Sequence, residues 1–118
     1  MFNLFKRNKE KRFSPADWTI GDMPGFKVIH NPDSVQYVNE DAGKVIYFSV
    51  LTVSGKNLFT NDAIPEGPAI TATDGGWQLK GARKSPGQIL VCVISLMNQD
   101  DIEWAKDFFN SIRYKHAT

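Results

Sequence analysis

The ten residues Gln88–Met97 restrict the fold of this chain more than any other stretch. They read Gln-Ile-Leu-Val-Cys-Val-Ile-Ser-Leu-Met and lie between Ser85-Pro86-Gly87 and Asn98-Gln99-Asp100-Asp101. The length, the β-branched residues and the turn residues on both sides favour a strand over a helix. Successive side chains of a strand point to opposite faces, and here both faces are apolar. We therefore expect a strand in the middle of a sheet, covered on both sides.

A second long run, Lys44–Val53, has the same property, because neither of its two faces is clearly polar. Two interior strands of this kind need cover on both faces of the sheet, yet the sequence predicts only one substantial helix. The second face must be covered by the segment Ser14–Met23, by the loop Gly55–Gly67, by curvature of the sheet, or by another molecule. A partner or a second copy is a real option, because an apolar patch of this kind is seldom left open.

Shorter runs bounded by turn residues complete the predicted sheet. Asn31-Pro32-Asp33 suits a tight reversal, and Asp74-Gly75-Gly76 is a hairpin signal. The four shorter strands are expected at Phe26–His30, Ser34–Val38, Ala69–Thr73 and Trp77–Arg83. The prediction is an α+β fold: an antiparallel meander of about six strands with one C-terminal amphipathic helix and a short N-terminal helical turn.

The C-terminal helix is expected from about Asp101 to Tyr114. At ~100° per residue its apolar side chains fall within an arc of roughly 160°, which predicts one face packed on the sheet. Asp100 and Glu103 fit a capping box, and Ser14-Pro15 fits the start of a short helix near the N-terminus. The apolar residues of the C-terminal helix are Ile102, Trp104, Ala105, Phe108, Phe109 and Ile112.

Length and charge divide the chain into two parts. The 118 residues are enough for one domain that buries roughly two-thirds of its unfolded surface. Residues 1–13 hold five basic residues against Glu10, or +4, whereas the rest holds nine basic and twelve acidic residues, or −3. We expect a flexible basic tail over 1–13 and a single domain over 14–118.

Location and chemistry are constrained by what the residues lack. No apolar run approaches the ~20 residues that span a bilayer, and the N-terminus lacks the order of a secretory signal. The single cysteine, Cys92, excludes an internal disulfide and suits a reducing cytoplasm. His30 and His116 stand alone, so we expect no metal, no cofactor, no catalytic site and no enzyme activity. The basic group Lys80, Arg83 and Lys84 is too small to predict a nucleic-acid surface.

The leading functional hypothesis is a small protein-binding domain of the adaptor, chaperone or immunity type. The loop Gly55–Gly67 is unusually long, and such loops often bind something. We expect partner contacts from this loop and from an exposed apolar sheet surface, with a homodimer as one form of partner. The alternative is that the loop caps the chain's own core. The predicted partner-binding residues are Leu58, Phe59, Ile64 and Trp77.

Two other classes of function remain open. In the first, the tail tethers the domain to a membrane surface, with apolar side chains in the interface and cations on anionic lipid; the alternative is a solvated chain end. In the second, the domain carries a small ligand in a pocket between sheet and helix, with Tyr47, Ser49 and Ser95 as polar groups. The tether would consist of Phe2, Leu4, Phe5, Lys6 and Arg7.

The order of elements resembles that of PsbP-like and DcrB-like domains, over roughly Trp18 to Tyr114. The stretches that carry the resemblance are Met23-Pro24-Gly25-Phe26-Lys27-Val28, Gly87-Gln88-Ile89-Leu90-Val91-Cys92-Val93 and Ala105-Lys106-Asp107-Phe108-Phe109-Asn110-Ser111-Ile112. Members of that group mostly act as binding or assembly proteins without catalytic residues. The resemblance therefore implies an adaptor or chaperone-like role and supplies no site residues.

Overall fold

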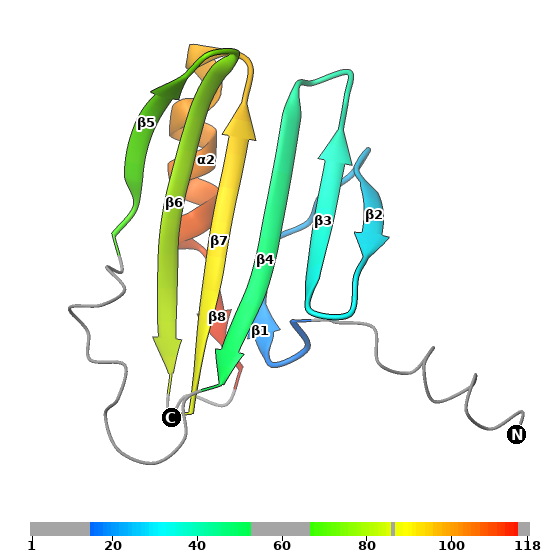
Figure 1. Cartoon of the computed structure of the whole chain (residues 1–118), viewed down its shortest axis with the longest axis vertical. Helices are drawn as coiled ribbons and strands as arrows, with labels where there is room; N and C mark the ends of the chain where they lie inside the picture. The colour runs from blue at the N-terminus through cyan, green and yellow to red at the C-terminus, as the bar shows by residue number, and fades with distance from the viewer. Residues whose placement is uncertain (1–14, 53–66, 86, 116–118) are drawn as a thin grey trace, which may run out of the picture.

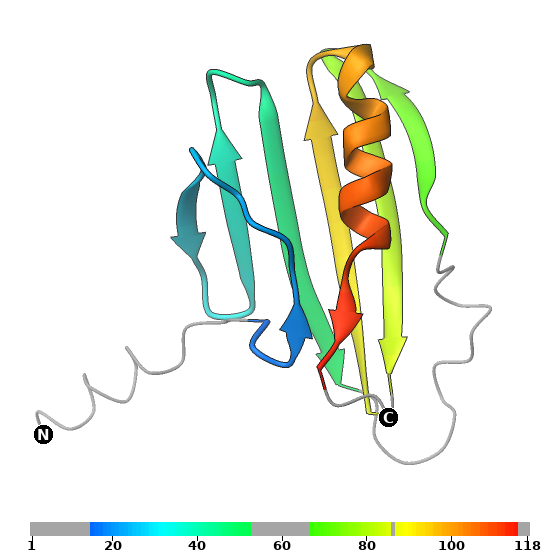
Figure 2. The same ribbon diagram turned by 180° about the vertical axis from the view of Figure 1, so that it is seen from behind.

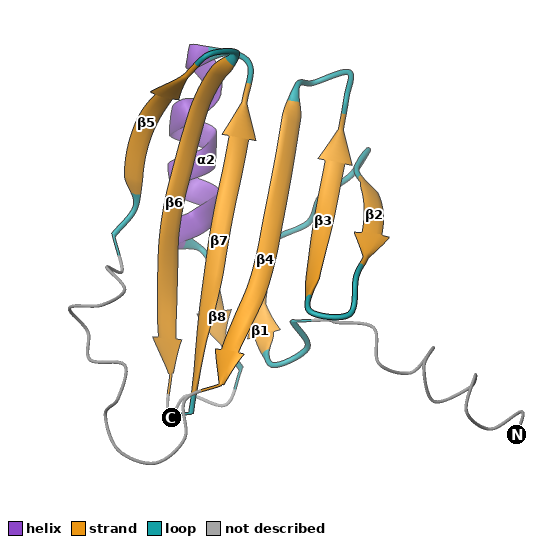
Figure 3. Cartoon of the chain, in the orientation of Figure 1, coloured by secondary structure: helices purple, strands orange, loops and turns teal. Residues whose placement is uncertain are grey.

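The computed structural model describes residues 15–52, 67–85 and 87–115, which form an α+β fold as predicted (Figure 1). Six strands form one antiparallel sheet, two short strands form a separate ladder, and one α-helix follows a 3-10 turn (Figure 3). The strands of the large sheet are β2 (Lys27–His30), β3 (Ser34–Asn39), β4 (Lys44–Thr52), β5 (Ala69–Thr73), β6 (Gly76–Ser85) and β7 (Gln88–Leu96). The remaining elements are β1 (Trp18–Thr19), β8 (Arg113–Tyr114), η1 (Gln99–Asp101) and α2 (Ile102–Asn110).

The two long apolar runs lie side by side in the middle of the sheet. The strand order is β2-β3-β4-β7-β6-β5, so two three-strand meanders run inward from opposite edges and meet where β4 pairs with β7. This pairing runs from Lys44 opposite Leu96 to Thr52 opposite Gln88. The prediction that both runs are interior strands is confirmed. The sheet is not one continuous meander in space, because the chain passes from β4 to the far edge before it returns through β6 to β7.

One face of the sheet, here called the inner face, holds the core. The central inward side chains of β4 and β7 are fully or almost fully buried, whereas Lys44, Val50 and Gln88 near the strand ends are half-buried. The helix α2 packs across β6 and β7 on this face (Figure 2). Burial of this apolar surface is the main favourable term for folding. The central inner-face residues are Ile46, Phe48, Leu90, Cys92 and Ile94, and the helix adds Ala105, Phe108, Phe109 and, just beyond its end, Ile112.

The short β1–β8 ladder also covers the inner face, below α2 in Figure 2. Trp18 is only 4% exposed, its indole Nε1–H donates to Oε1 of Gln88 at 2.8 Å, and its ring lies 5.1 Å from that of Tyr114. The predicted helix start at Ser14 lies outside the described residues. The residues after it form a turn, closed by the Trp18 N–H on the Pro15 carbonyl at 3.1 Å, and then a strand instead of a helix.

The predicted C-terminal helix was too long and its predicted cap was wrong. The helix ends at Asn110, where the Ser111 N–H donates to the Asp107 carbonyl at 3.1 Å and the Ser111 hydroxyl donates to the Phe108 carbonyl at 2.7 Å. The chain then straightens because Arg113 and Tyr114 pair with β1. At the other end, Asp100, which was predicted to form the capping box with Glu103, lies inside η1, and the N-cap residue of α2 is Asp101. Asp101 makes no side-chain capping bond, and its Oδ1 lies 3.9 Å from Nζ of Lys44.

The described residues therefore form two layers, and only one face of the large sheet is covered by the other described elements. The helix and the β1–β8 ladder both lie on the inner face, as the two opposite views show (Figures 1 and 2). None of the described helices or short strands crosses the opposite face, here called the outer face.

Candidate functional site

The outer face carries a band of mostly apolar side chains along β4 and β7. Alternation and the register of β4 against β7 place four directly opposed pairs there. We call these eight residues the outer band. Its pairs are Val45 with Ser95, Tyr47 with Val93, Ser49 with Val91, and Leu51 with Ile89.

The side chains of the outer band are only partly withdrawn from solvent. Leu51 is 39% exposed, and Val45, Tyr47, Val91 and Val93 are half-buried, in contrast to the fully buried residues on the other side of the same strands. Only Ile89, at 4%, is buried. An apolar surface of this kind in the middle of a sheet marks a place where another molecule could remove more of it from water.

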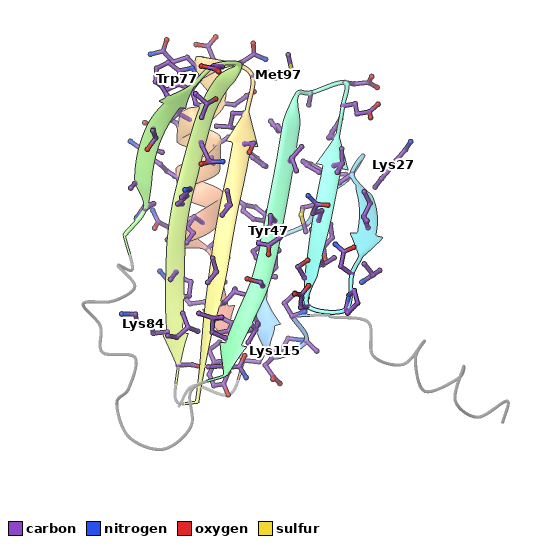
Figure 4. The ribbon with its side chains drawn as sticks, in the orientation of Figure 1. Lys27, Tyr47, Trp77, Lys84, Met97 and Lys115 are labelled. Carbon is purple, nitrogen blue, oxygen red and sulfur yellow. The ribbon has the colours of Figure 1, made fainter. Side chains whose placement is uncertain are left out.

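A notch of about 400 Å³ continues the outer band at the upper end of the sheet, where the β3–β4 and β5–β6 turns lie. Val38 and Val45 line one side, Trp77 and Thr73 line the other, and the end of β7 lies between them. Met97, the first residue after β7, is 67% exposed at this notch (Figure 4). A volume of this order accommodates a small ligand or one large side chain.

Two glycines bring the flanking turns close to the end of β7. A Cβ on Gly76 would lie 2.0 Å from the Leu96 carbonyl oxygen, so a side chain there would push β6 away from β7. Gly43 has a φ of +66°, and a Cβ there would lie 3.0 Å from the Met97 side chain. The Met97 N–H also donates to the Gly43 carbonyl at 3.0 Å. The glycines at positions 43 and 76 therefore allow the flanking turns to lie close to the end of β7.

Two charged residues, Glu40 and Lys44, line the notch. Lys44 lines the notch, but its ammonium lies over the Trp104 ring, 4.0 Å from the ring centroid, and 3.9 Å from the Asp101 carboxylate. Both partners belong to the η1–α2 region on the inner face. The notch therefore offers mainly apolar surface, which favours an apolar side chain over an anion.

The reactive residue types considered in the sequence, Cys92 and His30, lie on different strands, β7 and β2. Burial raises the pKa of the Cys92 thiol to about 12, so the thiol stays protonated and lacks the character of a nucleophile at neutral pH. Residues 15–52, 67–85 and 87–115 contain no group of three His, Cys, Asp or Glu residues placed to hold a metal ion. His30 is exposed at the end of β2, and His116 lies outside the described residues.

The structure separates the predicted binding residues. Trp77 lies on the inner face by its register opposite Leu96, packs against the core and forms one wall of the notch. The other three predicted partner-binding residues, Leu58, Phe59 and Ile64, lie outside the described residues, as does the whole predicted tether of Phe2, Leu4, Phe5, Lys6 and Arg7.

Two further groups of predicted residues are divided between the faces. The three polar residues suggested for a pocket between sheet and helix, Tyr47, Ser49 and Ser95, all belong to the outer band. Of the small basic group, Lys80 and Lys84 lie on the outer face, whereas Arg83 lies on the inner face with its guanidinium 5.7 Å from the centroid of the Phe109 ring.

Sequence reasoning recognised that β4 and β7 are apolar on both faces, but of the outer band it named only Tyr47, Ser49 and Ser95, as polar groups of a pocket. Val45, Val93 and Met97 were missed as site residues. The available signal was the absence of a second long amphipathic helix, which leaves one side of each long strand without predicted cover.

Comparisons with family models, curated protein sequences and solved structures find no match for this chain. The resemblance to PsbP-like and DcrB-like domains therefore stays a prediction. None of the helices among the described residues has the length and apolar character needed to cross a membrane.

Proposed function

We propose that this chain is a non-enzymatic partner-binding domain whose outer face receives another protein. The observation that carries the proposal is the unequal cover of the two central strands. Both faces of β4 and β7 are largely apolar, yet every described element outside the sheet lies on the inner face. Covering the outer band would remove further apolar surface from water, at about 25 cal/mol per Å² of surface buried.

The notch extends this surface at the upper end of the sheet. Interfaces gain much of their affinity from a few side chains inserted into preformed pockets. The notch is lined by exposed Met97 and by Trp77. Met and Trp are enriched at protein interfaces, because Met adapts its shape and Trp offers a large flat surface. The outer band would supply contact area, and the notch would accept one anchoring side chain of the partner.

The test is site-specific photo-crosslinking in the cells that produce the protein. Tyr47→p-benzoylphenylalanine places the reactive group in the outer band, and Glu103→p-benzoylphenylalanine places it on the exposed side of α2 as a matched control. We expect Tyr47→p-benzoylphenylalanine to give one discrete heavier species after illumination and the control to give none.

Three results would overturn the proposal. Crosslinking only within the chain would show that the outer face is already covered. Equal crosslinking from both positions would show contact without a preferred face. The absence of a heavier species from both variants, at native expression levels, would show that the outer band has no protein partner.

A further inference from the structure

The notch combines apolar walls with an unpaired carboxylate at its edge. Glu40 lines the notch from the β3–β4 turn, is exposed, and has no ion-pair partner among the described residues. Asp41 is the next residue, and Asp74 lies in the β5–β6 turn between two residues that line the notch; both are exposed and unpaired within the described chain. A positively charged group that enters the notch would therefore meet complementary charge.

The lysines at this end of the sheet leave the Glu40 carboxylate free. The ammonium of Lys44 is held on the inner face by the ring and the carboxylate described above. Lys27 lies on the outer face of the edge strand β2, opposite Val38, and shares a smaller hollow with Glu40 on the far side of that valine. It forms no ion pair with a described residue, and Figure 4 shows its side chain directed away from the notch.

From this arrangement we propose that the side chain of the partner that enters the notch is an arginine or a lysine. The inference rests on the proposed function and names the chemistry of the anchoring side chain. Its aliphatic stem would lie between Val45 and Trp77, and its charged head would reach Glu40. Long cationic side chains bury their methylene groups on apolar surface while the charged head stays in water. An indole ring nearby adds attraction for the cation.

The shape of the notch suits such a side chain. Val38, Val45, Trp77 and Met97 supply apolar surface around a volume of about 400 Å³, which is enough for one long side chain. Met97 is 67% exposed and flexible, so it can adapt to the stem. The anchor also uses the end of the outer band that is open, since Ile89, at the opposite end of β7, is already buried.

Charge distinguishes this occupant from others. An acidic or phosphorylated segment and an anionic lipid surface would both be repelled by the carboxylate of Glu40 and its acidic neighbours. A leucine or phenylalanine side chain would fill the apolar walls but would gain nothing from the carboxylate. The basic residues among positions 6–12 of a second copy have the required charge, and they appear below as a separate outcome of the test.

The test uses three small probes with the full chain. Butylguanidine carries an aliphatic stem and a cationic head, methylguanidine carries the head without the stem, and pentanoate carries a stem with an anionic head. In two-dimensional NMR, butylguanidine is expected to shift the amide signals of Gly43, Gly75 and Met97 with a dissociation constant in the millimolar range. Methylguanidine and pentanoate should each bind at least about tenfold more weakly, and the preference over pentanoate should shrink at high salt.

Two variants test the role of the carboxylate. Glu40→Gln keeps the size of the side chain but removes its charge, and it should weaken butylguanidine by about three- to fivefold. Asp107→Asn removes one exposed carboxylate from α2 and is the matched control, which should leave the affinity unchanged. A loss caused by Asp107→Asn as large as that caused by Glu40→Gln would overturn the inference. Pentanoate or methylguanidine binding as tightly as butylguanidine, or no shift at the notch with any probe, would overturn it as well.

Three further outcomes separate this inference from the function on which it rests. A discrete protein crosslink from Tyr47→p-benzoylphenylalanine, together with no preference for butylguanidine, would leave partner binding intact and refute only the cationic anchor. Butylguanidine binding at the notch without any protein crosslink would overturn the partner and assign the notch to a small cationic ligand. Self-association by light scattering that Glu40→Gln abolishes would assign the notch to the basic residues of a second copy.

Discussion

The inner and outer faces of the central strands are built from the same two runs of sequence but have different surroundings. Inward side chains such as Ile46 and Ile94 are fully buried under α2 and the β1–β8 ladder, whereas their outward neighbours Val45 and Val93 stay half-buried. Apolar composition decides that these strands lie in the middle of the sheet. It does not decide that both faces are covered by the same chain.

The largest expected difference between the faces is in the free energy of unfolding. Ile94→Ala should lower it by about 2–5 kcal/mol, because it leaves a cavity in a close-packed layer. Val93→Ala, one residue away on the outer face, should cost about 1 kcal/mol, since its methyl groups already meet water. Urea denaturation of both variants measures the contrast. Equal losses would mean that the outer face is as tightly packed as the inner one.

The second prediction uses Cys92 as a reporter of the inner face at alkaline pH. An unfolded thiol loses its proton near pH 9.0, whereas burial raises the pKa of the folded thiol to about 12. The folded state then holds one more proton, so stability falls as the pH rises between these values, by up to about 1.4 kcal/mol per pH unit.

Cys92→Ala should remove this contribution, so the difference in unfolding free energy between the two proteins should change with pH above 9 and stay constant below it. Burial also raises the pKa of Tyr37, but that contribution is present in both proteins and cancels. Parallel curves from pH 7 to pH 11 would contradict the burial of the thiol under α2.

The third prediction concerns the hydrogen bond that holds β1 against the inner face. Gln88→Ala removes the acceptor of the buried Trp18 indole N–H and the donor to the Asp17 carboxylate at 3.3 Å, which should cost about 1–2 kcal/mol. Gln78→Ala makes the same chemical change on the outer face of β6 and should cost less than about 0.5 kcal/mol. Thermal denaturation compares the two variants. Equal decreases in melting temperature would show that the hydrogen bond between Trp18 and Gln88 makes no specific contribution to stability.

The smallest expected effect is that of charge on the outer face. Lys80→Glu should change the unfolding free energy by no more than about 0.5 kcal/mol, because an exposed side chain at this site contributes little to packing. Urea denaturation of the Lys80→Glu variant and the parent chain at low and high salt measures this difference in unfolding free energy. A loss of several kcal/mol would show that Lys80 supports the fold.

Much of the fold could be predicted because the signals are local. Turn residues such as Asp74-Gly75 mark strand ends, and the apolar stripe of the closing helix identifies its packed face. Strand order could not be predicted, since the pairing of β4 with β7 joins residues far apart in sequence. The helix end was missed for the same reason: Arg113 and Tyr114 leave the helical pattern to pair with β1, whose position depends on the folded sheet.

The candidate site was less predictable than the fold. Trp77 was predicted as a partner-binding residue, yet its register directs it to the inner face, where it packs against the core and also lines the notch. Val45 and Val93 look like ordinary core residues in sequence, because a strand with two apolar faces gives no sign of which face stays open. That distinction depends on where the helix and the chain ends pack.

Accessibility of methyl groups in the isolated chain tests the central claim most directly. A neutral gadolinium chelate broadens NMR signals of methyl groups that solvent can approach, so Val45, Val91 and Val93 can be compared with Ile46, Leu90 and Ile94. If the outer face is open, the three valines should broaden strongly while the inner-face methyls stay sharp. Equal protection of both sets would contradict the account, because it would show that the chain already covers the surface assigned to a partner.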